Sequence, residues 1–129
     1  MNASKILVVD DERRVREMIE FRLRRFGYEV LQAADGREAL DVAAEHQPDL
    51  ILLDVMMPDL DGFQVCRRLR QNDATKGIPV VMLTAKADAK DVTYAYNSGA
   101  QDYVVKPYDP LVLQQKVAQN LEATVDAEA

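Results

Sequence analysis

Residues 49 to 62, DLILLDVMMPDLDG, carry the most informative pattern in this sequence. Its four apolar residues LILL stop at one carboxylate, Asp54, and a turn containing Pro58 follows before the chain restarts at Gly62. A short apolar run that ends in a turn is typical of a strand buried in a parallel sheet. Because ligands of open α/β sheets bind beyond the carboxyl ends of the strands, this run predicts a site at Asp54. Taken alone, the stretch equally allows an aspartate that only caps a turn.

Length and composition indicate one ordinary globular domain. The chain has 129 residues, of which 48% are hydrophobic and 29% are charged. We expect residues 1–123 to form this domain and residues 124–129 to form an acidic C-terminal tail. The net charge of −6 argues against direct binding to nucleic acid or to an anionic membrane. No apolar run approaches the roughly 18 residues of a membrane span.

The single cysteine, Cys66, cannot form an internal disulfide, which fits a reducing cytoplasm. Its spacing among apolar neighbours is typical of a small core residue rather than a nucleophile. The N-terminal sequence MNASKILVVDD contains one lysine and few apolar residues before its acids, so we do not expect a signal peptide. These features predict a cytoplasmic location.

Apolar runs alternate with amphipathic segments along the whole chain. The expected strands are residues 6–9, 28–33, 50–53, 78–83 and 103–105. The expected helices are residues 12–26, 35–46, 62–71, 88–98 and 110–123. Five strand–helix repeats predict an α/β fold, a doubly wound parallel sheet with helices on both faces.

Individual residues support several of these helices. The first has apolar residues at positions 15, 18, 19, 23 and 26, and Gly27 is placed to end it. Its six arginines predict a solvated face, with docking of an acidic partner as the alternative. Asp35 and Glu38 predict a capping box, and Asp109 followed by Pro110 predicts the start of the last helix.

Four of the expected strands end in residues that carry chemistry. These residues are Asp10 with Asp11, then Asp54, Thr84 and Lys106. Parallel strands place their carboxyl ends on one edge of the sheet, so we expect these side chains to converge. Three clustered carboxylates repel one another unless a cation lies between them. Oxygen ligands without histidine or cysteine favour Mg²⁺ over zinc.

The same set of residues suits phosphoryl transfer. A carboxylate can attack phosphorus and form an aspartyl phosphate. Mg²⁺, a lysine and a hydroxyl donor are groups that stabilise a phosphoryl transition state. Each of these residues alone is a weak signal. Their occurrence together at the ends of four strands makes the combination specific.

The sequence resembles the receiver domain of two-component response regulators. The matching motifs cover essentially the whole chain: ILVVDDE at 6–12, DLILLDVMMPDLDG at 49–62, PVVMLTA at 79–85 and GAQDYVVKPYDP at 99–110. The resemblance implies the flavodoxin-like (βα)5 fold, with five parallel strands in the order 2-1-3-4-5. It also implies a signalling domain that assists only its own phosphorylation and dephosphorylation, rather than an enzyme.

The resemblance assigns a role to each candidate site residue. It implies that Asp54 is the phosphoacceptor and that Asp11 binds Mg²⁺ directly. Asp10 would bind the metal largely through water, and Met56 would offer its backbone carbonyl. Thr84 would hydrogen-bond a phosphoryl oxygen.

Two further roles concern the strand that ends at Lys106. By resemblance, Lys106 would pair with the phosphoryl group or with Asp54, and its bond to Pro107 would be cis. Tyr103 occupies the position of the family's switch aromatic. Since side chains alternate along a strand, we expect Tyr103 to point away from the acid cluster, beside Tyr94 or Tyr96.

The implied partner is a histidine kinase or a histidine phosphotransfer protein, which would donate phosphate to Asp54 in a phosphorelay. Thr84 and Tyr103 would then move inward, and the face of the fourth helix, fifth strand and fifth helix would change its partners. The output partner or effector domain is unspecified. The protein would be a monomer or a phosphorylation-dependent dimer.

Four positions bear on dimerisation through that face. Regulators that dimerise there often carry a fixed set of charges. This chain has Asp102 and Lys116 in suitable places, but Gln101 and Val112 where acids are often found. The pattern weakens the expectation of that dimer without removing it.

Three alternatives were weighed against the receiver interpretation. A flavodoxin-type module shares the fold, but here the loop after the first strand, Asp10-Asp11-Glu12, would repel the phosphate of FMN. A phosphatase of the haloacid dehalogenase type needs a second acid two residues after the nucleophile, where this chain has Met56. The third alternative is a receiver that has lost phosphorylation and serves as a scaffold, and the complete acid set argues against it.

Overall fold

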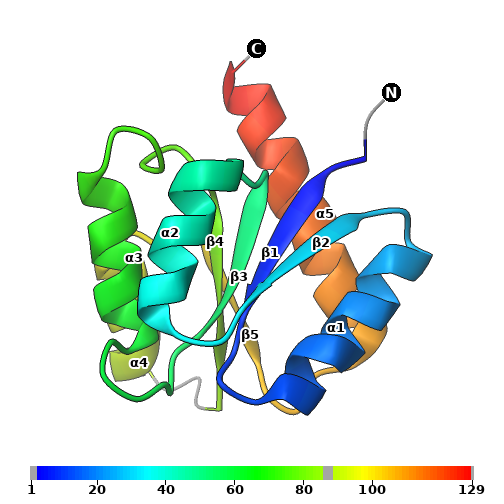
Figure 1. The fold of residues 1–129 in the computed structure, drawn as a ribbon, viewed down its shortest axis with the longest axis horizontal. Helices are drawn as coiled ribbons and strands as arrows, with labels where there is room; N and C mark the ends of the chain where they lie inside the picture. Colours follow the sequence, from blue (N-terminus) through cyan, green and yellow to red (C-terminus); the bar gives the residue numbers. More distant parts are fainter. Residues whose placement is uncertain (1–2, 86–88, 129) are drawn as a thin grey trace.

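Five strands and five helices alternate along the part of the chain that the structure, a computed structural model, describes: residues 3–85 and 89–128 (Figure 1). The strands are β1 (Lys5–Val9), β2 (Glu29–Ala33), β3 (Leu50–Asp54), β4 (Val80–Thr84) and β5 (Asp102–Val105). The helices are α1 (Arg13–Arg25), α2 (Gly36–His46), α3 (Gly62–Gln71), α4 (Ala89–Asn97) and α5 (Pro110–Glu128).

The strands form one parallel sheet in the order β2-β1-β3-β4-β5, which confirms the predicted fold. Its register aligns the strand ends: Val9 pairs with Leu53, Asp54 with Leu83, and Thr84 with Val105. The residues that leave the sheet after these pairs therefore emerge at one edge.

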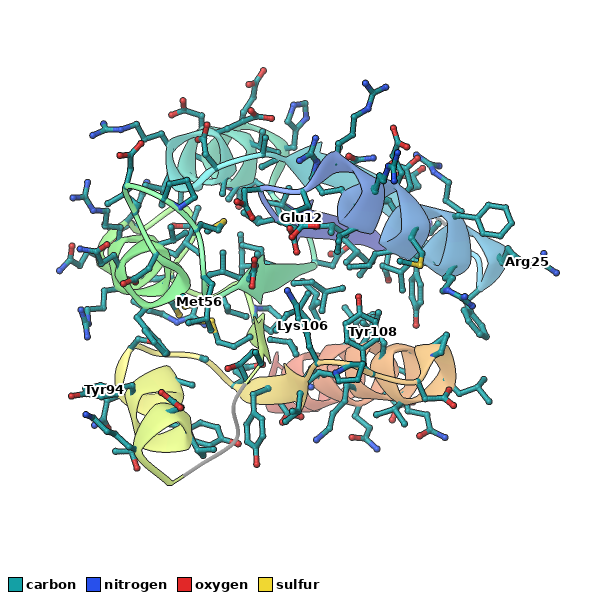
Figure 2. The ribbon with its side chains drawn as sticks, turned by 90° about the horizontal axis from the view of Figure 1, so that it is seen from below. Glu12, Arg25, Met56, Tyr94, Lys106 and Tyr108 are labelled. Atoms are coloured by element: carbon teal, nitrogen blue, oxygen red, sulfur yellow. The ribbon has the colours of Figure 1, made fainter. Side chains whose placement is uncertain are left out.

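Each central strand buries both of its faces, because helices cover both sides of the sheet (Figure 2). On one side, Leu7, Ile51 and Met82 face the core shared with α2, α3 and α4. On the other, Leu52 and Leu83 face Ile19 and Leu23 of α1 and Leu113 and Val117 of α5. Alternation along the strands explains why the runs at β3 and β4 read as continuously apolar.

Local side chains fix the helix ends. Asp35 caps α2 by accepting the Glu38 N–H. The reciprocal capping box forms at α3 instead, between Asp61 and Gln64, where the sequence analysis did not expect it. Before α5, the carboxylate of Asp109 accepts the Leu111 N–H at 2.7 Å.

The structure differs from the sequence expectations at a few positions. Among the apolar residues at helical spacing in the first helix, Ile19 and Leu23 of α1 are buried against the sheet. Met18 and Phe26, the residue that follows α1, are exposed. The helical backbone of α5 runs to Glu128, through the segment expected to be a tail. The expected start of the fourth helix, Asp88, lies outside the described residues.

None of the described helices combines the length and the apolar character that crossing a bilayer requires.

Gly62 allows α3 to begin directly against the end of β3. A Cβ at this position would lie 2.5 Å from the Asp54 carbonyl oxygen and 2.9 Å from Val55 Cα, both of them backbone atoms. We predict that Gly62→Ala lowers the free energy of unfolding by about 1–3 kcal/mol, the usual cost of overpacking. Urea unfolding followed by circular dichroism measures this difference.

Gly77→Ala is the matched control, because a Cβ at Gly77 meets nothing within 4 Å. We expect that variant to be neutral or stabilised by less than about 1 kcal/mol. Equal destabilisation of the two variants would show that the close approach at Gly62 has no special cost.

Candidate functional site

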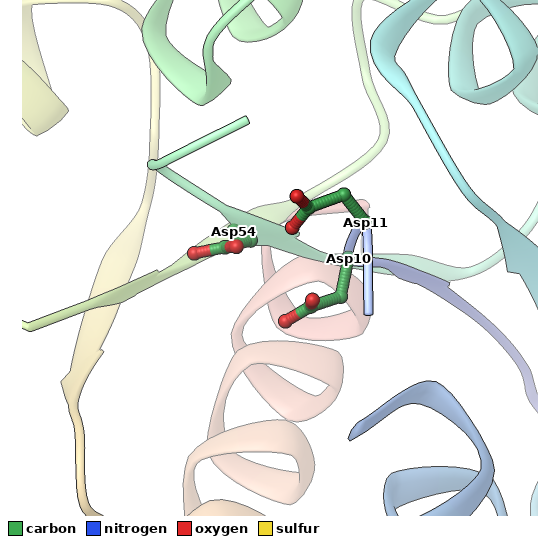
Figure 3. A group of neighbouring side chains, drawn as sticks. All are labelled: Asp10, Asp11 and Asp54. Atoms are coloured by element: carbon green, nitrogen blue, oxygen red, sulfur yellow. The ribbon is translucent and has the colours of Figure 1, made fainter. Parts of the chain in front are cut away.

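Three carboxylates meet at the carboxyl edge of the sheet. Asp10 and Asp11 follow β1, Asp54 ends β3, and one carboxylate oxygen from each lies within 4.8 Å of the others (Figure 3). The register pairs Val9 with Leu53, and this brings the residues that follow β1 beside the end of β3. The expected convergence is confirmed for the ends of these two strands.

The three acids differ in burial and in the contacts that hold them. Asp10 is 1% exposed and Asp54 is 5% exposed, whereas Asp11 is exposed. The Asp10 carboxylate accepts the Glu12 N–H at 2.9 Å. The Asp54 carboxylate accepts the Met56 N–H at 3.4 Å. Two acids are therefore fixed, and the third faces the solvent from which a ligand would arrive.

Lys106 supplies positive charge to this cluster from the end of β5. Its Nζ lies 3.1 Å from Asp54 Oδ1 and 3.5 Å from Asp10 Oδ2. Figure 2, a view onto this edge of the sheet, shows Lys106 between the ribbons that carry Met56 and Tyr108. The bond between Lys106 and Pro107 is cis, as the resemblance predicted.

Opposing effects act on the pKa of Asp54 and on the pKa of Lys106. Burial raises the pKa of Asp54, and the charge of Asp10 adds to this, while the Lys106 ammonium acts in the opposite direction without cancelling the rise. Burial lowers the pKa of Lys106, but the hydrogen bond and charge of Asp54, together with Asp10, outweigh burial and raise it. The lysine therefore stays protonated, whereas the carboxylates are left with an excess of negative charge.

This donor set fits a hard divalent cation. All three side chains offer carboxylate oxygens, the ligands that Mg²⁺ prefers, and their negative charge exceeds what Lys106 compensates. That the backbone carbonyl of Met56 also binds the cation stays a prediction.

Thr84 and Tyr103 lie on one side of the acid cluster, toward α4. Both line a void of about 10 Å³ together with Phe63, Asp91 and Ala95. Such a space is at the lower limit for one water molecule and is far too small for a phenol ring. Tyr103 packs edge-on against Tyr96 of α4, with ring centroids 6.1 Å apart, which confirms its predicted position.

Charged residues on the α4–β5–α5 face bind one another. Lys116 Nζ lies 3.1 Å from both carboxylate oxygens of Asp102, and the Asn120 amide donates to Asp102 Oδ2 at 3.1 Å. The two charges considered for a dimer are thus paired within the chain.

One contact of the acid loop was missed by the sequence analysis, which counted Arg16 with the arginines of the solvated face. Arg16 is half-buried and donates to the backbone carbonyl of Asp10 at 2.8 Å. Nothing in the sequence separates Arg16 from the five neighbouring arginines, because the contact depends on how α1 lies against β1 and β2.

Two methionines near the site expose their side chains. Met56 is 74% exposed and Met18 is 51% exposed. An open groove of about 420 Å³ runs from Met18 past Lys106 to Tyr108. The acid cluster therefore lies beside a surface suited to contact with another protein.

The model of the response regulator receiver domain family matches residues 6–118. The chain belongs to this family and is a receiver domain of two-component response regulators. Membership favours this interpretation over the flavodoxin-type module and the phosphatase.

The curated relatives include DNA-binding regulators. The chain is 45% identical over 125 residues to the DNA-binding response regulator MtrA of Mycolicibacterium smegmatis, covering 97% of this chain and 54% of that protein. It is 46% identical over 113 residues to the alkaline phosphatase synthesis transcriptional regulatory protein PhoP of Bacillus subtilis, covering 88% and 46%. The chain spans about half the length of the curated relatives it matches.

Solved structures show the same fold. The chemotaxis protein CheY4 of Vibrio cholerae matches with a TM-score of 0.88 and 36% identity, covering 92% of this chain and 98% of that one. The receiver domain of the sensor histidine kinase PA1611 from Pseudomonas aeruginosa matches with a TM-score of 0.86 and 32% identity, covering 93% and 98%. In that structure a magnesium ion is coordinated in the active site cleft.

We predict that Mg²⁺ binds at the acid cluster and that Asp11→Ala weakens this binding more than about 10-fold, since even residues that only orient ligands are worth about 10–100-fold. The chain contains no tryptophan, so amide shifts in an NMR titration are a better readout than intrinsic fluorescence.

Asp59→Asn is the control, because it removes one exposed carboxylate that lies outside the cluster. We expect its Mg²⁺ affinity to match that of the parent. An unchanged affinity in Asp11→Ala would place the cation elsewhere.

Proposed function

We propose that this receiver domain accepts a phosphoryl group on Asp54 from a histidine kinase or a histidine phosphotransfer protein, in a Mg²⁺-dependent reaction. The observation that carries the proposal is the position of Asp54 within one cluster with Asp10, Asp11 and Lys106, in a chain of the receiver family. We place the reaction in the cytoplasm, which fits the one free, buried cysteine, Cys66.

In the proposed transfer, a carboxylate oxygen of Asp54 attacks the phosphorus of a phosphohistidine. A new O–P bond forms as the N–P bond breaks, and the electron pair returns to the imidazole nitrogen of the donor. Burial fixes the Asp54 carboxylate in one place, which reduces the cost of orienting it for attack. The nucleophile must be ionised, and Lys106 opposes the effects that raise the pKa of Asp54.

Asp11 would hold the cation directly, Asp10 largely through water, and Met56 through its backbone carbonyl. When bound, Mg²⁺ would supply positive charge to the phosphoryl oxygens and relieve the repulsion among the acids. Lys106, 3.1 Å from Asp54, would move its hydrogen bond to a phosphoryl oxygen, where its fixed charge stabilises the transition state. Thr84 would donate its hydroxyl to another phosphoryl oxygen.

The proposed donor is a protein, and the surface beside the site is suited to one. Met56 and Met18 expose flexible apolar side chains that adapt to a partner surface. The groove that Met18 lines also contains Lys106, so a partner covering it would present its histidine next to Asp54.

The proposed output is a change in the α4–β5–α5 face. Drawing Thr84 toward a phosphoryl group on Asp54 would open space beside Tyr103, which the present void of about 10 Å³ denies to its ring. A coupled pair with two arrangements is the kind of element that a modification can bias. The names of MtrA as a DNA-binding response regulator and PhoP as a transcriptional regulatory protein support transcription as an output, through a DNA-binding domain outside the matched region.

The domain would act as a monomer or as a phosphorylation-dependent dimer. The ion pair between Asp102 and Lys116 leaves these charges engaged within the chain. A dimer through this face would have to add contacts to that pair or exchange it across the interface. The domain assists only its own phosphorylation and dephosphorylation, so we do not propose an enzyme.

We predict that a small phosphodonor with Mg²⁺ labels the parent and that Asp54→Asn abolishes the label, because an amide lacks the nucleophilic oxygen. Intact-mass analysis and phosphate-affinity gels measure the label. Asp59→Asn is the control and should label like the parent. Labelling of Asp54→Asn at the parental level would disprove the assignment, and absence of label in the parent would favour the scaffold alternative.

We predict that a beryllofluoride mimic with Mg²⁺ shifts Tyr103 from a more exposed to a more buried rotamer, with NMR shifts across residues 84–105. Thr84→Ala should suppress the changes at Tyr103 while Asp54 is still phosphorylated, because the hydroxyl that is drawn inward is lost. Thr84→Ser keeps that hydroxyl and should retain the response. A full response in Thr84→Ala would refute the coupling.

A further inference from the structure

Arg16 binds the backbone of the acid loop rather than solvent. Its Nη1 donates to the carbonyl oxygen of Asp10 at 2.8 Å, and its Nε donates to Gln32 Oε1 at 3.0 Å. One guanidinium thus connects α1, the residue after β1 and the carboxyl-terminal part of β2. Its two donors lie in one plane, so Gln32 fixes the direction in which the other donor points at Asp10.

Gln32 and the guanidinium are held in turn by other side chains. The amide of Gln32 donates to Glu20 Oε1 at 2.9 Å, and Glu20 pairs with Arg24 at 3.3 Å. Arg24 donates to the carbonyl oxygen of Val30 at 3.2 Å. These hydrogen bonds and the ion pair form one continuous chain of contacts from β2 across α1 to the acid loop.

The carbonyl that Arg16 contacts belongs to the peptide that joins Asp10 to Asp11. A peptide group is planar, so fixing this oxygen also fixes the backbone nitrogen and Cα of Asp11. Asp11 is exposed, unlike Asp10. The orientation of its carboxylate toward Asp54 therefore depends on the orientation of this peptide plane.

We propose that Arg16 is a positioning residue for the cation site, acting through the Asp10–Asp11 peptide. This inference rests on the proposed Mg²⁺-dependent function. Arg16 sets where the Asp11 carboxylate points, and Gln32 holds the guanidinium in the direction that this requires. A single ammonium at position 16 could reach one acceptor but would lack the planar pair of donors.

The experiment compares Arg16→Met with the parent by NMR titration with MgCl₂, following the amides of residues 10–12 and 54. Methionine keeps an unbranched apolar stem and removes both donors. We expect the Mg²⁺ affinity to fall about 10-fold, the lower end for residues that orient metal ligands. Labelling by a small phosphodonor should need correspondingly more Mg²⁺ for half-maximal rate, with the parental rate restored at saturating Mg²⁺.

Arg25→Met is the matched control, since Arg25 is on the same helix and its guanidinium carbon lies 5.6 Å from the centroid of the Phe21 ring, outside the chain of contacts that leads to Asp10. We expect Arg25→Met to bind Mg²⁺ like the parent and Arg16→Lys to restore only part of the affinity. Gln32→Met provides a second test that keeps Arg16 in place, and it should weaken Mg²⁺ binding less than Arg16→Met does.

Each outcome separates this inference from the proposed function. A parent that neither binds Mg²⁺ nor accepts phosphate would overturn the proposed function itself. A parent that does both, with Arg16→Met binding Mg²⁺ equally well, would overturn the positioning role alone. Equal weakening in Arg16→Met and Arg25→Met would assign the effect to general loosening of α1. A reduced rate at saturating Mg²⁺ would also contradict the inference.

Discussion

Three carboxylates that repel one another are held together at the carboxyl edge of the sheet. Asp10, Asp11 and Asp54 lie within 4.8 Å of one another, and two of them are almost completely buried. Lys106 lies close to two of these acids, so the cluster keeps a negative excess that a divalent cation can neutralise. A fold that maintains such a cluster must be rigid enough to prevent the acids from separating.

That rigidity comes from the central strands. β1 and β3 are buried on both faces, and the side chains of each face pack against helices on that side. The loops beyond these strands are held in turn by backbone contacts, including the hydrogen bond from the Gly62 N–H to the Val55 carbonyl at 2.9 Å. The core thus fixes the positions at which Asp10 and Asp54 leave the sheet.

The proposed switch residues, Thr84 and Tyr103, lie beside this rigid core. Tyr103 lies at the boundary between the core and the α4 surface, in edge-on contact with Tyr96. The adjacent void is too small to accept its ring, so an inward movement of Tyr103 requires its neighbours to move as well. This close packing supports the proposed coupling between an event at Asp54 and the α4–β5–α5 face.

Much of the site was predictable from sequence, because a parallel strand ends where its apolar run ends. The runs before Asp10, Asp54 and Thr84 gave both the strands and their terminal residues, and parallel topology then required convergence. The width of the buried face of the first helix was not predictable. Met18 and Phe26 fit the apolar helical spacing and yet are exposed, because that spacing does not say how wide the buried face is.

Local periodicity was enough to predict the alternation of strands and helices and their apolar faces, and the ends of the apolar runs marked the acids. The polar side chains that hold the loops could be found only in the folded chain. Arg70 donates to the carbonyl oxygens of Lys76, Ile78 and Gly99, and Arg16 donates to that of Asp10. The sequence pattern around each of these arginines is typical of a surface residue. Their backbone acceptors have no side-chain signature, and they come within reach only when packed elements bring separate segments together.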